Sequence, residues 1–265
     1  GSVNNNGLEF ELGWKDSIGD FGYSIDANLS TLNNKVTYLE PSVGHISGTS
    51  FSNHKIETYF QEGYPVWYIR GFEYAGLDSD GNAQYVKADG TLTTTPNDDD
   101  LKYIGSGLPD LTYGITIRLD WKGIDFTAFG TGSAGNSLVP CVYRPQHQQV
   151  NCITYFYDEA GKSLPTIDKF YNSVDFWSST ATVFKGDFFK IKQLQLGYTL
   201  PGKYTKKILI DSFRAFVSLD DWFVFTKYPG FDPETASTGG STGRGFDKGS
   251  YPNAKKLLFG VNIAF

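Results

Sequence analysis

The chain has 265 residues, a net charge of −6 and a pI near 5.1. This acidic balance excludes a nucleic-acid partner, because no basic stripe exists to neutralise phosphates. Aromatic residues make up 16%, glycines number 30 and methionine is absent, which favours β structure over helix. No stretch approaches about 18 consecutive apolar residues, so no transmembrane helix is predicted. The mean hydropathy of −0.31 is compatible with strands that alternate apolar and polar residues.

Seven segments alternate in this way over the length of about 9–11 residues that a tilted strand needs to cross a bilayer. In chain order they cover residues 8–16, 21–31, 111–121, 124–132, 187–199, 212–222 and 255–265. The fourth is less regular, because Phe126 and Phe129 are out of phase. The fifth carries Lys190 and Lys192 in its apolar phase, which predicts a bulge or an end outside the membrane. In the sixth, Phe216 is the exception to the alternation.

The links between these segments alternate strictly between short and long. Short links lie at 16–20, 122–123 and 200–211, and long ones at 32–110, 132–187 and 222–255. Barrels of bacterial outer membranes have tight periplasmic turns and long extracellular loops. The pattern therefore predicts an all-β, antiparallel transmembrane barrel in the cell outer membrane of a Gram-negative bacterium. On this interpretation Phe265, an aromatic terminus on a dyad strand, is the signal for outer-membrane insertion.

Seven strands cannot close a barrel, because single-chain bacterial barrels have even strand counts and an open edge in lipid leaves backbone groups unpaired. No signal peptide opens the chain either. We therefore expect a fragment that meets the remaining strands of its barrel. The polar phase of the strands is expected to line the lumen, where its residues pair with each other or with a plug: Glu9, Glu11, Asp26, Asn28, Arg118, Asp120, Arg214, Asp220 and Asn262.

An enzyme is not expected. The three histidines, His45, His54 and His147, fall in predicted loops without an accompanying catalytic arrangement. No metal or other cofactor is expected: residues 78–82 start like a calcium loop, but Gly81 comes too early, and a hairpin turn is the simpler interpretation. The acidic run 98–100 is interpreted as a solvated loop tip. Cys141 and Cys152 form a disulfide or remain two thiols, and the sequence leaves this open.

Direct contact with a substrate is more plausible in the long loops, where aromatic rings can stack on sugars or pack on peptide side chains. The residues chosen for this role are Arg144, Tyr155, Tyr157, Tyr171, Asp175 and Trp177.

Several motifs resemble a known family. They include Gly186 to Lys192 (GDFFKIK), Leu196 to Pro201 (LGYTLP) and Phe225 to Glu234 (FTKYPGFDPE), with Phe265 at the end. Together they resemble the C-terminal region of SusC/RagA-type TonB-linked outer-membrane proteins over essentially the whole chain, residues 1–265. The N-terminal plug, the TonB-contacting segment and the earlier strands of that family are not in this sequence.

The resemblance implies a 22-stranded barrel of which this chain supplies the last seven or so strands, with outer-membrane lipid around it. It also implies import of oligosaccharides or oligopeptides, coupled through TonB, with a SusD-like surface lipoprotein as a lid. One alternative is a barrel that anchors surface loops for binding a polysaccharide or protein without transport. A further alternative is a soluble β-sandwich lectin.

Overall fold

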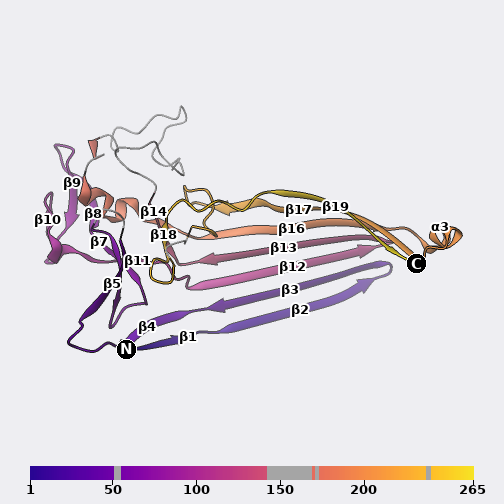
Figure 1. Ribbon diagram of the computed structural model, residues 1–265, viewed down its shortest axis with the longest axis horizontal. Coiled ribbons are helices and arrows are strands. Elements are labelled where there is room, and N and C mark those ends of the chain that lie inside the picture. Colours follow the sequence, from indigo (N-terminus) through magenta and orange to yellow (C-terminus); the bar gives the residue numbers. More distant parts are fainter. Residues whose placement is uncertain (51–54, 142–168, 171–172, 237–239) are drawn as a thin grey trace.

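The computed structural model describes residues 1–50, 55–141, 169–170, 173–236 and 240–265. Its largest element is a seven-stranded antiparallel sheet of long strands that run side by side (Figure 1). From one edge to the other the strands are β19 (Lys256–Ala264), β17 (Ser212–Thr226), β16 (Phe188–Thr199), β13 (Ile124–Ala134), β12 (Leu111–Trp121), β3 (Phe21–Thr31) and β2 (Glu9–Ile18). These are the seven segments in which the sequence alternates.

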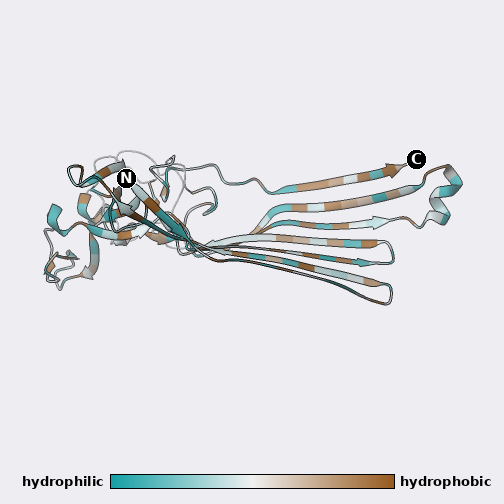
Figure 2. Ribbon diagram, turned by 90° about the horizontal axis from the view of Figure 1, so that it is seen from below, coloured by the Kyte–Doolittle hydropathy of each residue, from teal (hydrophilic) through white to brown (hydrophobic). Residues whose placement is uncertain are grey.

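Pairing between neighbouring strands gives the sheet two chemically different faces. Residues that pair across strands share a face, and successive residues of one strand alternate between faces. Ile117 of β12 lies between Ile25 and Ala128, whereas Thr116 lies between Asp26 and Phe129. One face is therefore largely apolar and the other largely polar, as the hydropathy bands along the strands in Figure 2 illustrate. Phe126 belongs to the apolar face after all, because it pairs with Leu119 and Leu196.

The irregularity predicted near Lys190 is a bulge. The register of β16 shifts between Ile191 and Gln193 against both of its neighbours, which leaves Lys192 unpaired. This shift brings Lys190 opposite Thr131, on the polar face, although its sequence phase placed it on the apolar one. The expectation of a bulge is thus confirmed.

All three short links lie at one end of the sheet, together with the C-terminus (Figure 1). β12 and β13 are joined by Lys122–Gly123, whose positive φ values of 49° and 88° suit a tight two-residue hairpin. β2 extends to Ile18, so its link to β3 is shorter than expected. The third link contains α3 (Gly202–Thr205) and the 3-10 helix η4 (Lys206–Ile208).

The long links are folded into small sheets and short helices, which the sequence analysis did not predict. The first link, 32–110, forms two small sheets of its own and a third with β1 (Ser2–Asn6), which pairs with β4 (Asn33–Tyr38). One sheet of its own has four strands: β5 (His45–Ser50), β6 (Glu57–Gln61), β7 (Tyr68–Gly71) and β11 (Lys102–Ser106). The other has three strands: β8 (Glu73–Leu77), β9 (Ala83–Val86) and β10 (Leu92–Thr93). The other two links supply a further three-stranded sheet of β14 (Ser137–Pro140), β15 (Phe184–Lys185) and β18 (Phe246–Asp247). The helices of the long links are short: η1 (Asp98–Asp100), α2 (Val174–Trp177) and η3 (Thr180–Thr182).

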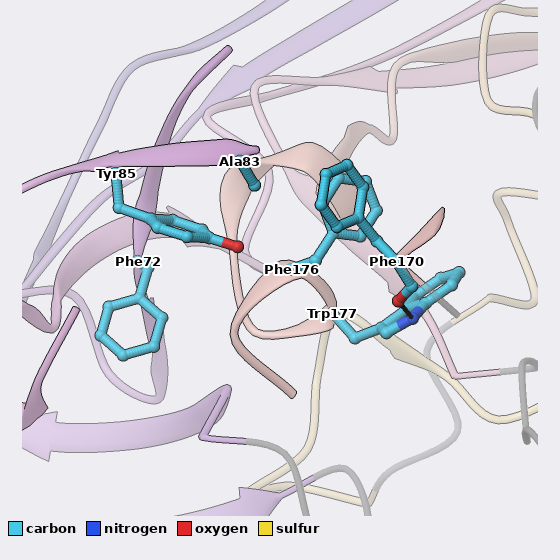
Figure 3. Close-up of a cluster of buried hydrophobic side chains, with 6 residues drawn as sticks. All are labelled: Phe72, Ala83, Tyr85, Phe170, Phe176 and Trp177. Atoms are coloured by element: carbon cyan, nitrogen blue, oxygen red, sulfur yellow. Dashed lines mark hydrogen bonds between the residues drawn. The ribbon is translucent and has the colours of Figure 1, made fainter. Parts of the chain in front are cut away.

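Three hydrophobic clusters bind the long links into one body, which we call the outer layer. The first, shown in Figure 3, joins Phe72 and Tyr85 of the first link to Phe176 and Trp177 of the second. The second cluster takes residues from all three links: Ile56, Ile69, Val139 and Phe246. The third joins Leu138 to Tyr228 and Ala236. The sequence missed this layer because its strands are too short to show a clear period.

Candidate functional site

The nine residues expected to line a lumen all lie on the polar face of the seven-stranded sheet. One ion pair joins two of these residues, Arg118 and Asp26, and a second joins Arg214 to Asp125 on the same face. Arg118 Nη1 lies 2.6 Å from Asp26 Oδ2, and the Arg214 guanidinium contacts both oxygens of Asp125 at 2.8 and 2.5 Å. The two-point contact of Arg214 with Asp125 combines strength with a fixed geometry. The polar face is thus an ordered network of hydrogen bonds and charges.

A glycine makes the second pair possible. Arg214 of β17 and Asp125 of β13 are separated by the intervening strand β16, where Gly197 stands between them. A Cβ at that position would lie 2.5 Å from both Arg214 Nη2 and Asp125 Oδ1. The missing side chain therefore allows the two charged groups to meet above β16, and Gln195 Oε1 accepts a further bond of 2.9 Å from Arg214.

Four of the six residues chosen for substrate contact, Arg144, Tyr155, Tyr157 and Tyr171, lie outside the described residues. Trp177 is 4% exposed in the first cluster, where its indole N–H donates to the carbonyl of Phe170 at 3.1 Å (Figure 3). Its ring belongs to the core of the outer layer and offers no open face for stacking. Asp175 is half-buried nearby, and burial raises the pKa of its carboxyl against the opposing effect of Lys55.

Other sequence-based expectations have mixed outcomes. Residues 78–82 form the predicted turn between β8 and β9, in which Asp78 Oδ1 accepts from the amides of Asp80 and Asn82 at 3.0 and 2.7 Å. The acidic run 98–100 forms η1 and is solvated only in part: Asp98 and Asp99 are exposed, whereas Asp100 is 3% exposed and accepts from the amides of Ala88 and Asn97. Cys141 packs against the second cluster, whereas Cys152 falls outside the described residues.

Sequence reasoning also missed a row of aromatic rings on the four-stranded sheet of the outer layer. Tyr64 stacks on Tyr68 with ring centroids 4.5 Å apart, and Tyr103 lies 5.6 Å from Tyr68. Arg70 stands over Tyr59, 4.9 Å from its centroid. Tyr64 and Tyr103 remain 38% and 44% exposed, so part of this row is available for contact. The signal was spread over strands of four or five residues and a turn, too far apart in sequence to be read as one set.

A buried charge cluster ties the bulge of β16 to the outer layer; we call it the lysine latch. Lys190 is 1% exposed, and its Nζ lies 2.7 Å from both Asp232 Oδ2 and Glu234 Oε2. Lys192 Nζ lies 2.9 Å from Glu234 Oε1 and 3.1 Å from Asp221 Oδ1. The latch thus joins two sequence motifs, GDFFKIK and FTKYPGFDPE, whose shared role the sequence did not reveal.

Acidification is expected to loosen the latch. Burial raises the pKa of Glu234, but hydrogen bonds from Lys190 and Lys192 outweigh it, so its folded-state pKa lies below the ordinary value of 4.5. A depressed carboxyl pKa contributes stability that is complete above the unfolded-state pKa and is lost as pH falls through the folded-state pKa. Thermal unfolding in detergent should therefore show a loss below about pH 4.5 that Glu234→Gln largely lacks. An equal acid loss in both proteins would assign it to other carboxyls.

No helix among the described residues is long and apolar enough to cross a membrane. Within the same part of the chain, no three His, Cys, Asp or Glu side chains come together as a metal centre requires.

Long antiparallel strands with one apolar and one polar face, linked tightly at one end and capped at the other, are those of an outer-membrane β-barrel wall. Comparison with known proteins agrees. The chain is 27% and 25% identical, over its whole length, to the TonB-dependent receptors P3 and P26 of Formosa agariphila, covering 29% of each. It is 22% identical to the TonB-dependent receptor SusC of Bacteroides thetaiotaomicron, covering 27% of it. No family profile matches.

Solved structures of the RagAB peptide transporter have the same fold over the length of this chain. The RagAB peptide transporter superposes with a TM-score of 0.77 at 21% identity, over 100% of this chain and 29% of that one. The 'closed-closed' state of the RagAB peptide importer gives 0.75 at 22% identity. The expected resemblance to SusC/RagA-type TonB-linked outer-membrane proteins is thus confirmed, and these relatives are named as receptors and transporters rather than enzymes. The chain spans less than a third of the length of the curated relatives it matches.

Proposed function

We propose that this chain forms the C-terminal part of the barrel wall, and of the extracellular layer above it, in a TonB-dependent nutrient importer of a Gram-negative outer membrane. One observation carries the proposal: the two-faced sheet has its tight links at one end and a single folded layer at the other. A membrane explains the apolar face and a water-filled lumen the polar one, while a soluble sandwich has no reason to sort its connections in this way.

The proposal assigns a side to each end of the sheet. The tight links and Phe265 lie in the periplasm, and the outer layer lies outside the cell, where a nutrient first arrives. Strands β2 and β19 are the edges of the sheet, and further strands of a longer polypeptide pair with them to close a barrel of 22. The plug and the TonB-contacting segment belong to that longer polypeptide.

The nutrient is an oligosaccharide or an oligopeptide, taken up beneath a SusD-like lipoprotein lid. Similarity to a receptor named SusC and to a peptide importer supports this pair of substrate classes. Arg144, Tyr155, Tyr157, Tyr171 and Asp175 remain candidates for contact with the substrate, and the exposed Tyr64 and Tyr103 join them. The nine polar-face residues line the lumen, where the ion pairs Arg118–Asp26 and Arg214–Asp125 keep the wall in shape.

Fractionation and uptake measurements test the proposal. The complete protein should be recovered in outer membranes and should migrate faster in electrophoresis before heating than after it. Cells that lack TonB should bind labelled oligosaccharide or oligopeptide at their surface but no longer accumulate it. Recovery in the soluble periplasm would exclude the barrel. Accumulation that is independent of TonB would exclude the importer and favour a surface anchor.

A further inference from the structure

The apolar face of the sheet carries a groove near the outer layer. The groove has a volume of about 700 Å³ and is lined by residues of β12, β15, β16 and β17 and of their ends: Tyr113, Lys185, Asp187, Phe188, Phe189, Val224, Phe225, Thr226 and Lys227. Tyr113, Phe189 and Phe225 stand in one row of paired residues across the sheet, with Gly132 between the first two. Because Tyr113 shares its face with Ile115 and Ile117, this row lies on the apolar side.

The floor of the groove is built by flat aromatic rings. The rings of Tyr113 and Phe189 are nearly parallel, 6.0 Å apart with an interplanar angle of 6°, and Phe225 continues the row 6.4 Å from Phe189. A Cβ on Gly132 would lie 2.5 Å from the ring of Tyr113, and one on Gly130 equally close to that of Phe189. The two glycines let the rings lie across β13, and the hydroxyl of Tyr113 donates to the carbonyl of Phe188 at 3.1 Å.

The row lies at the depth of a membrane interface. Tyr113 and Trp121 are eight residues apart on the same face of β12, which corresponds to about 27 Å along the strand and, at the usual strand tilt of about 35–45°, to about 20 Å across the membrane. The apolar band of outer-membrane barrels is about 25 Å tall and is flanked by aromatic residues at both interfaces. Trp121 is at the end with the tight links, so Tyr113, Phe189 and Phe225 mark the opposite interface.

Two exposed lysines stand above this row, on the side of the outer layer. Lys227 follows Phe225 by two residues, and Lys185 ends the short strand β15. Neither lysine forms an ion pair with any side chain in the described part of the protein. Asp187, the one acidic residue of the groove, accepts a 2.8 Å bond from the amide of Gly135. The groove therefore combines apolar rings at membrane depth with an excess of positive charge just above them.

We propose that this groove binds a phosphate-bearing lipid of the outer leaflet. The acyl chains lie along Phe225 and Phe189, and the phosphate meets Lys185 and Lys227 at the level of the headgroups. Aromatic rings at an interface accommodate both an apolar chain and a polar edge, and lysines close to the surface attract anionic headgroups. The inference rests on the membrane-embedded barrel proposed above.

Binding to lipids in mixed micelles tests the proposal with the complete, folded protein. The probes are diphosphoryl lipid A, its dephosphorylated form with the same acyl chains, and inorganic phosphate. We expect diphosphoryl lipid A to bind and the double variant K185Q/K227Q to bind it roughly thirty-fold more weakly, since each lysine near an anionic surface accounts for about a fivefold change. Phe225→Ala should weaken the binding of both the phosphorylated and the dephosphorylated lipid, because it removes part of the apolar wall of the groove without altering its charge.

The matched control is K206Q/K207Q, which removes the same charge from exposed lysines at the opposite end of the sheet. Its affinity for diphosphoryl lipid A should be unchanged. Equal loss in the control and in K185Q/K227Q would overturn the proposal, as would equal binding of the dephosphorylated lipid. Displacement of the lipid by millimolar inorganic phosphate would also overturn it in favour of a free-anion site. Heat-dependent electrophoretic mobility of every variant separates these outcomes from a failure of the barrel itself.

Discussion

Replacing Lys190 with methionine should destabilise the protein by about 3–5 kcal/mol, because it leaves a buried carboxylate without its partner. The side chain of Asp232 is only 4% exposed, and its Oδ2 lies 2.7 Å from the lysine nitrogen that the substitution removes. The outer layer is held to the sheet at this point, so residues 222–255 should become accessible to protease first. Chemical denaturation in detergent and limited proteolysis measure the two effects.

Two further variants distinguish a buried charge from lost packing. Lys192→Met should cost much less, because Lys192 is 25% exposed and water can solvate its partners. Lys190→Met combined with Asp232→Leu should recover part of the loss, since both members of the pair then leave together. If the double variant is as unstable as the sum of the two single ones, the pair is not coupled in the way the geometry requires.

Arginine at Ile117 should prevent or strongly impair assembly in the membrane, while arginine at the adjacent Thr116 should be tolerated. Ile117 is central in β12 on the apolar face, where a proposed lipid contact makes arginine unfavourable by about 2–4 kcal/mol. Thr116 is on the polar face beside Asp26, which can pair with the new charge. The yield of heat-modifiable protein in outer membranes, and its stability after extraction, measure the difference.

These two substitutions introduce the same side chain one residue apart, so expression and net charge are matched. Equal tolerance at both positions would contradict an apolar face in lipid and favour a water-exposed sheet. Equal damage at both would indicate that β12 is packed on both faces by protein.

The seven long strands could be predicted from the sequence because period-2 alternation is strong over ten or more residues. Even the bulge was visible, since Lys190 and Lys192 break the apolar phase of an otherwise regular segment. Phe216 looked like a second irregularity but stays in register on the polar face, between Gly197 and Gly260. The rule that polar-face residues are polar fails there because the ring lies over Gly260 and is itself covered by the Arg214 guanidinium, 5.0 Å from the ring centroid.

The outer layer and the lysine latch could not be predicted in the same way. Strands of two to six residues give no reliable period, and their pairing depends on contacts such as Ile69 with Val139 that are distant in sequence. The sequence favours Trp177 for substrate contact, because an aromatic residue in a long loop has the same sequence signature whether it packs or binds. Only the described position of its ring, beside Phe170 and Phe176, separates the two roles.

The clusters that merge the three long links have a consequence for how such a protein is made and altered. Ile56 and Phe246 belong to one cluster although more than two thirds of the chain separates them, so the outer layer cannot complete its core until the last strands are in place. Contacts of this range form late and slowly. Because the three long links share this core, none of them can be exchanged between relatives without compensating substitutions in the other two. A change in the ligand specificity of the outer layer would therefore require the three long links to change together.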